Sequence, residues 1–275
     1  MEILDYLKWR GDLSFDEREF NELDAYILSM ILYEDFEHIL HHPKTLKDVS
    51  DIYFRLYSED DLKKRATLTR NYYPVLKAAA NTRRFESLVL SQYINDIDVS
   101  QDLQFCALTI QYKNKFKYIV FRGTDDTLVG WKEDFKMTYV DEILSQKKAV
   151  DYIISIDNQD SMLFKNFGKM DYYVGGHSKG GNLALYASGH APSKLQKRIK
   201  KIYCFDSPGF NKNVWDESML MIASKAENYM PTSSFFGRMF EHKEKITVIK
   251  SKQFGLLQHD LSKHNVCFWR ISVFN

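Results

Sequence analysis

Residues 176–180 read GHSKG and match the pattern Gly-x-Ser-x-Gly, with Ser178 at the centre. A serine nucleophile in this pattern lies on a sharp turn between a strand and a helix, where small residues on both sides let the two elements approach closely. The strand-like run DYYV (171–174) precedes the pattern and the helix-like run GNLALYASGHA (181–191) follows it. The spacing therefore predicts a nucleophile for acyl transfer, with a purely structural glycine turn as the alternative. No Gly-Lys-Ser/Thr tripeptide follows, which argues against a phosphate-binding loop.

A serine nucleophile needs a general base, normally a histidine that a carboxylate orients. His259 lies in the loop after the last expected strand, at the edge of the sheet where a base belongs. His264, five residues further on, is the alternative base. His190 is expected to point away from the site at the far end of the helix, and His242 reads as part of a solvated charged stretch, FEHKEK.

Asp206 is the predicted acid, because it ends the strand-like run IYCFDSPGF (202–210) and is followed by a turn with proline and glycine. A carboxylate at the carboxyl end of a strand can face the loop that carries the base. A turn-capping aspartate is the ordinary alternative. Glu227, which follows the next expected helix and precedes NYMPTSSFFG, is the alternative acid.

The oxyanion hole is predicted from two backbone segments. Residues 121–124, FRGT, leave a strand into a glycine turn, so that the N–H and the hydroxyl of Thr124 are candidate donors. The N–H of Lys179, directly after the nucleophile, is the second candidate donor. Trp131 and Asp134 are interpreted as residues that lock this loop.

The elements that must position these residues differ along the chain. The first hundred residues are predicted to be mostly helical, with helices within 20–40, 45–57 and 71–94, an N-cap at Asn21, and Pro74 near a helix start. From residue 104 the runs QFCALTIQY and FKYIVFRGT, joined by KNK, predict a hairpin. Helical and strand-like runs then alternate: helices within 145–156, 181–191 and 213–227, and strands within 171–178, 199–210 and 245–253.

This alternation predicts a mostly parallel α/β sheet with helices on both faces. We expect one structural domain, in which an N-terminal helical segment (1–100) packs on a core formed by residues 101–275. The region 230–240, MPTSSFFGRMF, is expected to line an acyl pocket, to cover it, or simply to pack in the core.

Composition narrows the classes of partner. The 38 basic and 37 acidic residues give a net charge of +1, which argues against a nucleic-acid partner. The N-terminus lacks the features of a signal peptide, and no run reaches the roughly 18 apolar residues of a membrane span, so a cytoplasmic protein is expected. The basic run KLQKRIKK (194–201) leaves open a weak contact with a membrane surface. The oligomeric state stays open.

No cofactor or metal is predicted. The three cysteines, Cys106, Cys204 and Cys267, are scattered and lack zinc-site spacing, and the first two fall in apolar runs that suggest buried thiols. The helical spacing of His38, His41 and His42 would suit a metal, but a solvated helix end before Pro43 is the ordinary interpretation. Asp125 and Asp126 lack a calcium-loop pattern.

The motifs VFRGT…W…DF and GGHSKGGNLA together resemble the class 3 lipases of the α/β-hydrolase superfamily, over roughly the second half of the chain. That resemblance implies an α/β-hydrolase fold, with Thr124 in the oxyanion hole and Ser178 as nucleophile. With the N-terminal run ILDYLKWRGDLSF and the later PTSSFFG and QHD, nearly the whole chain resembles a bacterial family of lipase-like proteins, which implies His259 as the base.

The sequence departs from the class 3 lipases in the region of the acid. Those enzymes have an aspartate in a D-x-V-P stretch, whereas residues 227–237 here read ENYMPTSSFFG. The acid is therefore assigned to Asp206, a position that certain other lipases of the fold use. The expected function is a serine hydrolase that cleaves carboxylic esters through an acyl-enzyme, and the resemblance implies lipid or acyl esters as substrates. A thioesterase or acyltransferase, and an inactive hydrolase-like binding module, are the alternatives.

Overall fold

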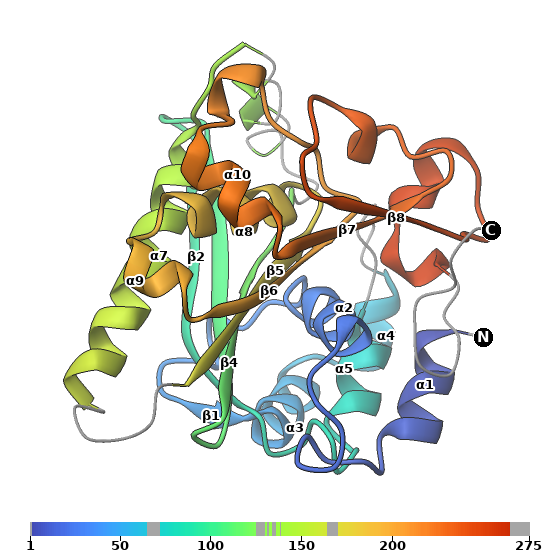
Figure 1. Cartoon of the computed structure of the whole chain (residues 1–275). Coiled ribbons are helices and arrows are strands. Elements are labelled where there is room, and N and C mark those ends of the chain that lie inside the picture. Colours follow the sequence, from blue (N-terminus) through green and yellow to red (C-terminus); the bar gives the residue numbers. More distant parts are fainter. Residues whose placement is uncertain are drawn as a thin grey trace.

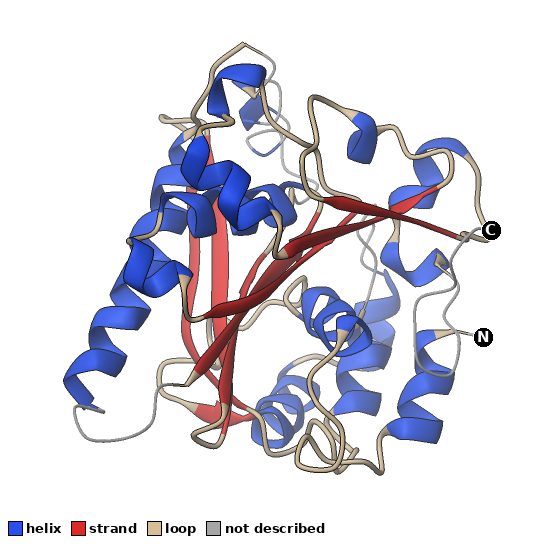
Figure 2. Ribbon diagram, viewed as in Figure 1, coloured by secondary structure: helices blue, strands red, loops and turns tan. Residues whose placement is uncertain are grey.

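The structure is a computed structural model that describes residues 2–64, 72–124, 130, 132–133, 136–137, 139–163 and 170–264. Its centre is an eight-stranded sheet in which the strands follow one another in chain order (Figures 1 and 2). The first four strands are antiparallel and β4 to β8 are parallel. The strands are β1 (Lys44–Thr45), β2 (Val89–Asp98), β3 (Leu103–Tyr112), β4 (Phe116–Phe121), β5 (Asp171–His177), β6 (Ile199–Phe205), β7 (Ala226–Pro231) and β8 (Lys245–Ile249).

Helices cover both faces of this sheet (Figure 1). One layer precedes most of the sheet in sequence: α1 (Ile3–Arg10), α2 (Glu22–Ile31), α3 (Leu46–Leu56), α4 (Glu59–Lys64) and α5 (Tyr73–Ala79). The opposite layer holds α7 (Leu144–Leu163), α8 (Lys179–His190), α9 (Ser193–Gln196) and α10 (Glu217–Ala223). Four short 3₁₀ turns are η1 (Lys212–Val214), η2 (Phe236–Arg238), η3 (Gly255–His259) and η4 (Leu261–Lys263).

Each face of the sheet has its own apolar core. Alternate residues of β4 show this division, because Val120 packs with the N-terminal helices and Ile119 packs with α7 and α8. The N-terminal helices therefore cover one face of the sheet, and Leu261 of η4 belongs to the same apolar cluster. None of the helices in the described part of the chain is both long enough and apolar enough to cross a bilayer.

The predicted hairpin is confirmed, since β3 and β4 pair antiparallel with Tyr112 opposite Phe116. The prediction of a mostly helical first hundred residues is wrong for β1 and β2. The third predicted helix (71–94) ends as α5 at Ala79, and its last residues belong to β2. Most of the side chains of β2 are only partly buried, which gives the run little apolar periodicity, and pairing with β3 decides its conformation.

The predicted helix within 20–40 is much shorter than expected. Asn21 caps its start as predicted, because the side-chain oxygen accepts from the N–H of Leu23 and Asp24, at 2.8 and 3.2 Å. The helix ends at Ile31, and the chain turns so that Glu34 accepts a hydrogen bond from Tyr53 in the core. His38, His41 and His42 consequently lie beyond the helix and are exposed.

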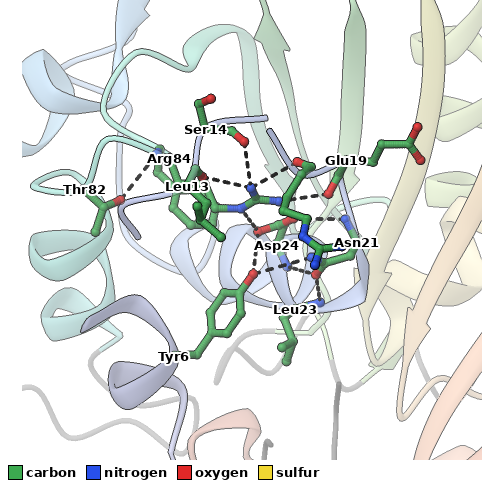
Figure 3. A network of polar contacts seen from close by, with 11 residues as sticks. Tyr6, Leu13, Ser14, Glu19, Asn21, Leu23, Asp24, Thr82 and Arg84 are labelled. Atoms are coloured by element: carbon green, nitrogen blue, oxygen red, sulfur yellow. Dashed lines mark hydrogen bonds and ion pairs between the residues drawn. The ribbon is translucent and has the colours of Figure 1, made fainter. Parts of the chain in front are cut away.

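A buried ion pair holds the N-terminal layer together (Figure 3). The Arg84 guanidinium donates to both carboxylate oxygens of Asp24, at 2.7 and 2.5 Å, and both side chains are almost fully buried. The remaining donors of Arg84 bind the main-chain oxygens of four residues before α2, namely Leu13, Ser14, Arg18 and Glu19. One side chain therefore fixes a segment that has no regular structure of its own.

Candidate active site

Ser178 lies at the turn between β5 and α8, with φ 56° and ψ −131°. This positive φ is unfavourable for a residue with a side chain, so the surrounding packing must impose it. The glycines of the pattern make the turn possible. A Cβ atom on Gly176 would lie 2.3 Å from the main-chain oxygen of Phe121, and one on Gly180 would lie 2.1 Å from the same atom. The pattern therefore forms a strained strand-to-helix turn, as the sequence predicts.

Asp206 and His259 are brought together from distant parts of the chain. The His259 Nδ1 and the Asp206 Oδ2 are 2.7 Å apart, and because a carboxylate only accepts, Nδ1–H donates. Asp206 follows β6 directly, and the Ser178 N–H donates to Phe205 O, the residue before Asp206, at 2.9 Å. The side chain of His259 is 21% exposed, whereas that of Asp206 is 1% exposed. A buried carboxylate thus orients a histidine that solvent can still reach.

Ser234 holds the other oxygen of the Asp206 carboxylate. Its hydroxyl donates to Oδ1 and accepts from the N–H of Gly237 at 2.8 Å. A Cβ atom on Gly237 would lie 2.4 Å from Oδ1, so only glycine leaves room for the carboxylate there. The region 230–240 therefore has a further role that the sequence did not reveal, which is to bind the carboxylate. Its PTSSFFG motif was the available signal.

The backbone at Asp206 is also unusual, with φ 49°. Asn228 on β7 stabilises this turn: its side-chain oxygen accepts from the N–H of Ser207 at 3.2 Å, and its amide donates to Ser207 O at 2.8 Å. The strand β7 was missed in the sequence, because it is short and follows a helix directly. Without it, neither Asn228 nor the location of the PTSSFFG turn could be anticipated.

The alternative acid, Glu227, and the alternative base, His264, do not take part in the contact between Asp206 and His259. Glu227 is near the start of β7 and binds Lys201 at 2.9 Å and Lys245 at 2.7 Å, so the structure does not bring it to His259. Partial burial opposes ionisation, but the hydrogen bonds from Lys245, Thr247 and Lys201 lower the pKa of Glu227 to about 2. His264 is buried, and its Nε2 donates to Gln258 O at 2.7 Å. Burial lowers the pKa of His264.

The prediction of a solvated His242 is wrong. Its side chain is 9% exposed, and its Nδ1 lies 2.6 Å from Glu244, whose other contacts include Asn228. The many charged residues of FEHKEK led to the prediction of an exposed segment, but His242 and Glu244 form a buried pair after the turn at Phe240. His190 lies at the far end of α8 from Ser178, as expected, and its Nδ1 contacts Tyr186 O at 2.9 Å.

The predicted oxyanion turn packs against Ser178. A Cβ atom on Gly123 would lie 3.0 Å from the Cβ of Ser178, so Gly123 allows the segment before Thr124 to approach. Lys179 begins α8, and its side chain forms a fully buried ion pair with Glu133 at 2.8 Å. Its Nζ also donates to the main-chain oxygen of Gln104 at 3.1 Å. This buried pair connects the elbow to the segment after the oxyanion turn, and sequence reasoning missed it.

Several predicted residues lie outside the described part of the chain, namely Asp125, Asp126, Trp131, Asp134 and Cys267. Cys106 and Cys204 are buried thiols, as expected. Among the described residues no group of three histidine, cysteine, aspartate or glutamate side chains is arranged to hold a metal ion.

Several solved structures have a similar fold at low sequence identity. The structure of a mutant MDLA from Penicillium cyclopium has a TM-score of 0.53 at 16% identity, covering 92% of this chain and 86% of that chain. The structure of M37 lipase has a TM-score of 0.49 at 14% identity, and the alignment covers 79% of this chain and 69% of that lipase. The Rhizomucor miehei lipase in its propeptide complex has a TM-score of 0.47 at 14% identity, and the alignment spans 63% of this chain and 58% of that lipase. The fold is the α/β-hydrolase fold.

Residues 79–272, more than half of the chain, match the model of the Mbeg1-like family. The chain therefore belongs to the Mbeg1-like family. No match was found among curated proteins.

The ion pairs of Glu227 allow a prediction on stability. Because the pKa of Glu227 is about 2 in the folded protein against an ordinary 4.5, its contribution to stability is present above pH 4.5 and is lost as the pH falls toward 2. Glu227→Gln removes that contribution. We expect the urea midpoint of the wild type to fall more steeply between pH 5 and pH 3 than that of the variant. Parallel curves would contradict this account of the carboxylate.

Proposed function

We propose that the protein is a serine hydrolase that cleaves carboxylic esters through an acyl-enzyme. The observation that carries the proposal is the 2.7 Å bond between His259 Nδ1 and the buried Asp206, at the strand end next to a serine on a strained turn. Proposed roles are Ser178 as nucleophile, His259 as general base and Asp206 as the acid that orients it. The chemistry requires no metal or organic cofactor.

The proposed reaction has two halves. Ser178 Oγ attacks the ester carbonyl while His259 Nε2 takes its proton, and the oxyanion accepts hydrogen bonds from the N–H groups of Thr124 and Lys179. His259 then gives the proton to the leaving alcohol, and the acyl group stays on Ser178. In the second half, water gives a proton to His259 and attacks the acyl carbonyl. The acid leaves as the bond to Ser178 Oγ breaks, and His259 returns the proton to that oxygen. Asp206 stabilises the imidazolium form of His259 in both halves.

An acyl or lipid ester is the proposed substrate class. Large exposed apolar side chains lie on the loop that carries His259 and next to Phe236: Phe254 is 85% exposed, Leu257 64% and Phe235 60%. The ring of Phe236 lies 4.5 Å from the ring of His259. Exposed apolar groups beside a hydrolytic site favour a hydrocarbon acyl chain over a polar one. The names of two similar structures, which are lipases, agree with this class.

Covalent labelling by a fluorophosphonate tests the proposal. An activated serine attacks the probe phosphorus, and mass spectrometry locates the adduct. We expect labelling at Ser178 in the wild type and none in Ser178→Ala. A folded wild-type protein that stays unlabelled, with and without detergent, would overturn the proposal and favour a binding module without catalysis. A panel of matched esters and thioesters, with added alcohols as acceptors, then separates hydrolase from thioesterase and acyltransferase.

The identity of the acid can be tested with two variants of similar chemistry. Asp206→Asn is expected to lower kcat by about 10⁴-fold, because the amide no longer holds the reactive tautomer of His259. Glu227→Gln, the control, is expected to retain wild-type kcat at pH 7, because Glu227 binds Lys201 and Lys245 instead. Ester turnover at saturating substrate is the measurement, and equal losses in both variants would argue against Asp206.

A further inference from the structure

His177, the residue before the nucleophile, contacts the loop that carries the proposed base. Its Nε2 lies 2.9 Å from the main-chain oxygen of His259, and the two imidazole rings are 4.4 Å apart at their centroids. On its other side, Nδ1 lies 2.7 Å from the hydroxyl of Tyr33, two residues past the end of α2. His177 therefore connects the N-terminal helical layer to the backbone of His259.

The hydrogen-bond partners determine the tautomer of His177. A carbonyl oxygen only accepts, so Nε2 carries the proton and donates to His259 O. Burial holds the pKa of His177 well below its ordinary value, so the ring is neutral and Nδ1 accepts from the Tyr33 hydroxyl. The direction of both hydrogen bonds is thus defined: Tyr33 donates to His177, and His177 donates to the main-chain oxygen of His259.

Other tyrosines of the N-terminal layer hold the same loop. The hydroxyl of Tyr26 on α2 donates to the main-chain oxygen of Leu261. The hydroxyl of Tyr72, directly before α5, donates to Asp260 Oδ1 at 3.0 Å. The hydroxyls of Tyr26 and Tyr72 therefore bind the His259 loop directly. The hydroxyl of Tyr33 binds His177, which in turn binds that loop.

We propose that Tyr33 and His177 are positioning residues that fix the backbone of His259, and so set the direction of its imidazole toward Ser178. The inference rests on the proposed function of Ser178, His259 and Asp206. The bond to Asp206 fixes the His259 side chain at one atom, Nδ1, and the orientation of the ring also requires a second fixed point, on the main chain of the short 3₁₀ turn. The bond from His177 to His259 O fixes that second point. The N-terminal layer is thereby a part of the active site.

Two His177 variants with the same functional group separate positioning from mere packing. In His177→Gln the amide nitrogen lies near the former Nε2 and can still donate to His259 O, whereas in His177→Asn the shorter amide cannot reach it. We expect His177→Asn to lower the rate of fluorophosphonate labelling by about 10²-fold, because a shift of the base by an ångström has effects of that size. We expect His177→Gln to recover most of that loss.

Tyr33→Phe is expected to lower kcat by about 10-fold, the size of one lost hydrogen bond, with KM unchanged. Its control is Tyr53→Phe, which removes a buried hydroxyl from the same layer, where it binds Glu34 rather than the His259 loop. The control is expected to keep wild-type kcat even if it lowers stability. Equal kcat losses in both variants would show that Tyr33 acts only through the stability of the layer, and would overturn the proposal.

Hydrogen–deuterium exchange of the peptide that covers residues 255–264 gives a readout independent of catalysis. We expect faster exchange in Tyr33→Phe and His177→Asn than in the wild type and in His177→Gln. Unchanged exchange together with unchanged labelling would overturn the positioning role. If the fluorophosphonate does not label the wild-type protein, the proposed function is overturned. The contact between His177 and His259 then has no role in catalysis, whatever the exchange rates are.

Discussion

Ser178→Ala is expected to lower kcat/KM for an ester substrate by about 10⁶-fold, because the nucleophile and its base act as one unit. The residual rate would come from substrate binding and the oxyanion donors alone. Since His259 and Asp206 depend on the same acyl-enzyme, adding His259→Ala to Ser178→Ala is expected to cost little more. Single-turnover assays with a chromogenic ester measure both. A loss below 10-fold in Ser178→Ala would rule out Ser178 as the nucleophile.

The same position allows a test of stored strain. With φ 56° and ψ −131°, Ser178 occupies a conformation that glycine adopts freely and alanine does not. Such positions cost on the order of 1–3 kcal/mol. We therefore expect Ser178→Gly to be as inactive as Ser178→Ala but more stable than it in urea, by about 1 kcal/mol. Equal midpoints for the two variants would show that the turn is not strained.

Arg84→Met is expected to lower the free energy of unfolding by about 3–5 kcal/mol, because it leaves Asp24 buried without its cation. It also removes the donors that bind the main-chain oxygens of residues 13–19. The matched control is Arg83→Met, at the neighbouring position, whose pair with Glu17 is exposed and is therefore expected to contribute little to stability. Urea denaturation followed by circular dichroism distinguishes the two.

The pH dependence of Arg84→Met has a definite sign. Burial raises the pKa of Asp24 even beside Arg84, and loss of the guanidinium raises it further. A carboxyl with a raised pKa binds its proton more tightly in the folded state, so folding becomes less favourable as the pH rises above the ordinary range of aspartate. The deficit of Arg84→Met is therefore expected to be smaller at pH 5 than at pH 7. A deficit that grows at pH 5 would contradict this assignment.

The parts of the fold that sequence predicts well are those with local signals. The elbow at Ser178 is defined by glycines within two residues of it, and the hairpin of β3 and β4 by two apolar runs around KNK. The alternation of helices and strands after residue 144, with the exception of β7, also follows from local periodicity. Each of these depends on neighbours in the chain, which is why the sequence reveals them.

The parts that sequence could not predict depend on distant contacts. The extended conformation of β2 depends on its pairing with β3, and not on local signals in the sequence of β2. The buried pair of His242 and Glu244 reads as solvated, since nothing local indicates that both side chains are enclosed. Ser234 and Tyr33 have no catalytic signature, and only the folded chain shows that one binds Asp206 and the other His177.

The sheet order has a consequence for synthesis on the ribosome. Because each strand pairs with the one made just before it, the sheet can grow in the order in which the chain emerges. The loop with His259 emerges after every strand, and its contact with α2 joins Tyr26 and Leu261, which are 235 positions apart. A nascent chain that has built its sheet thus still lacks the proposed base, and on the proposed mechanism Ser178 becomes reactive only when the C-terminal loop packs on the first helices.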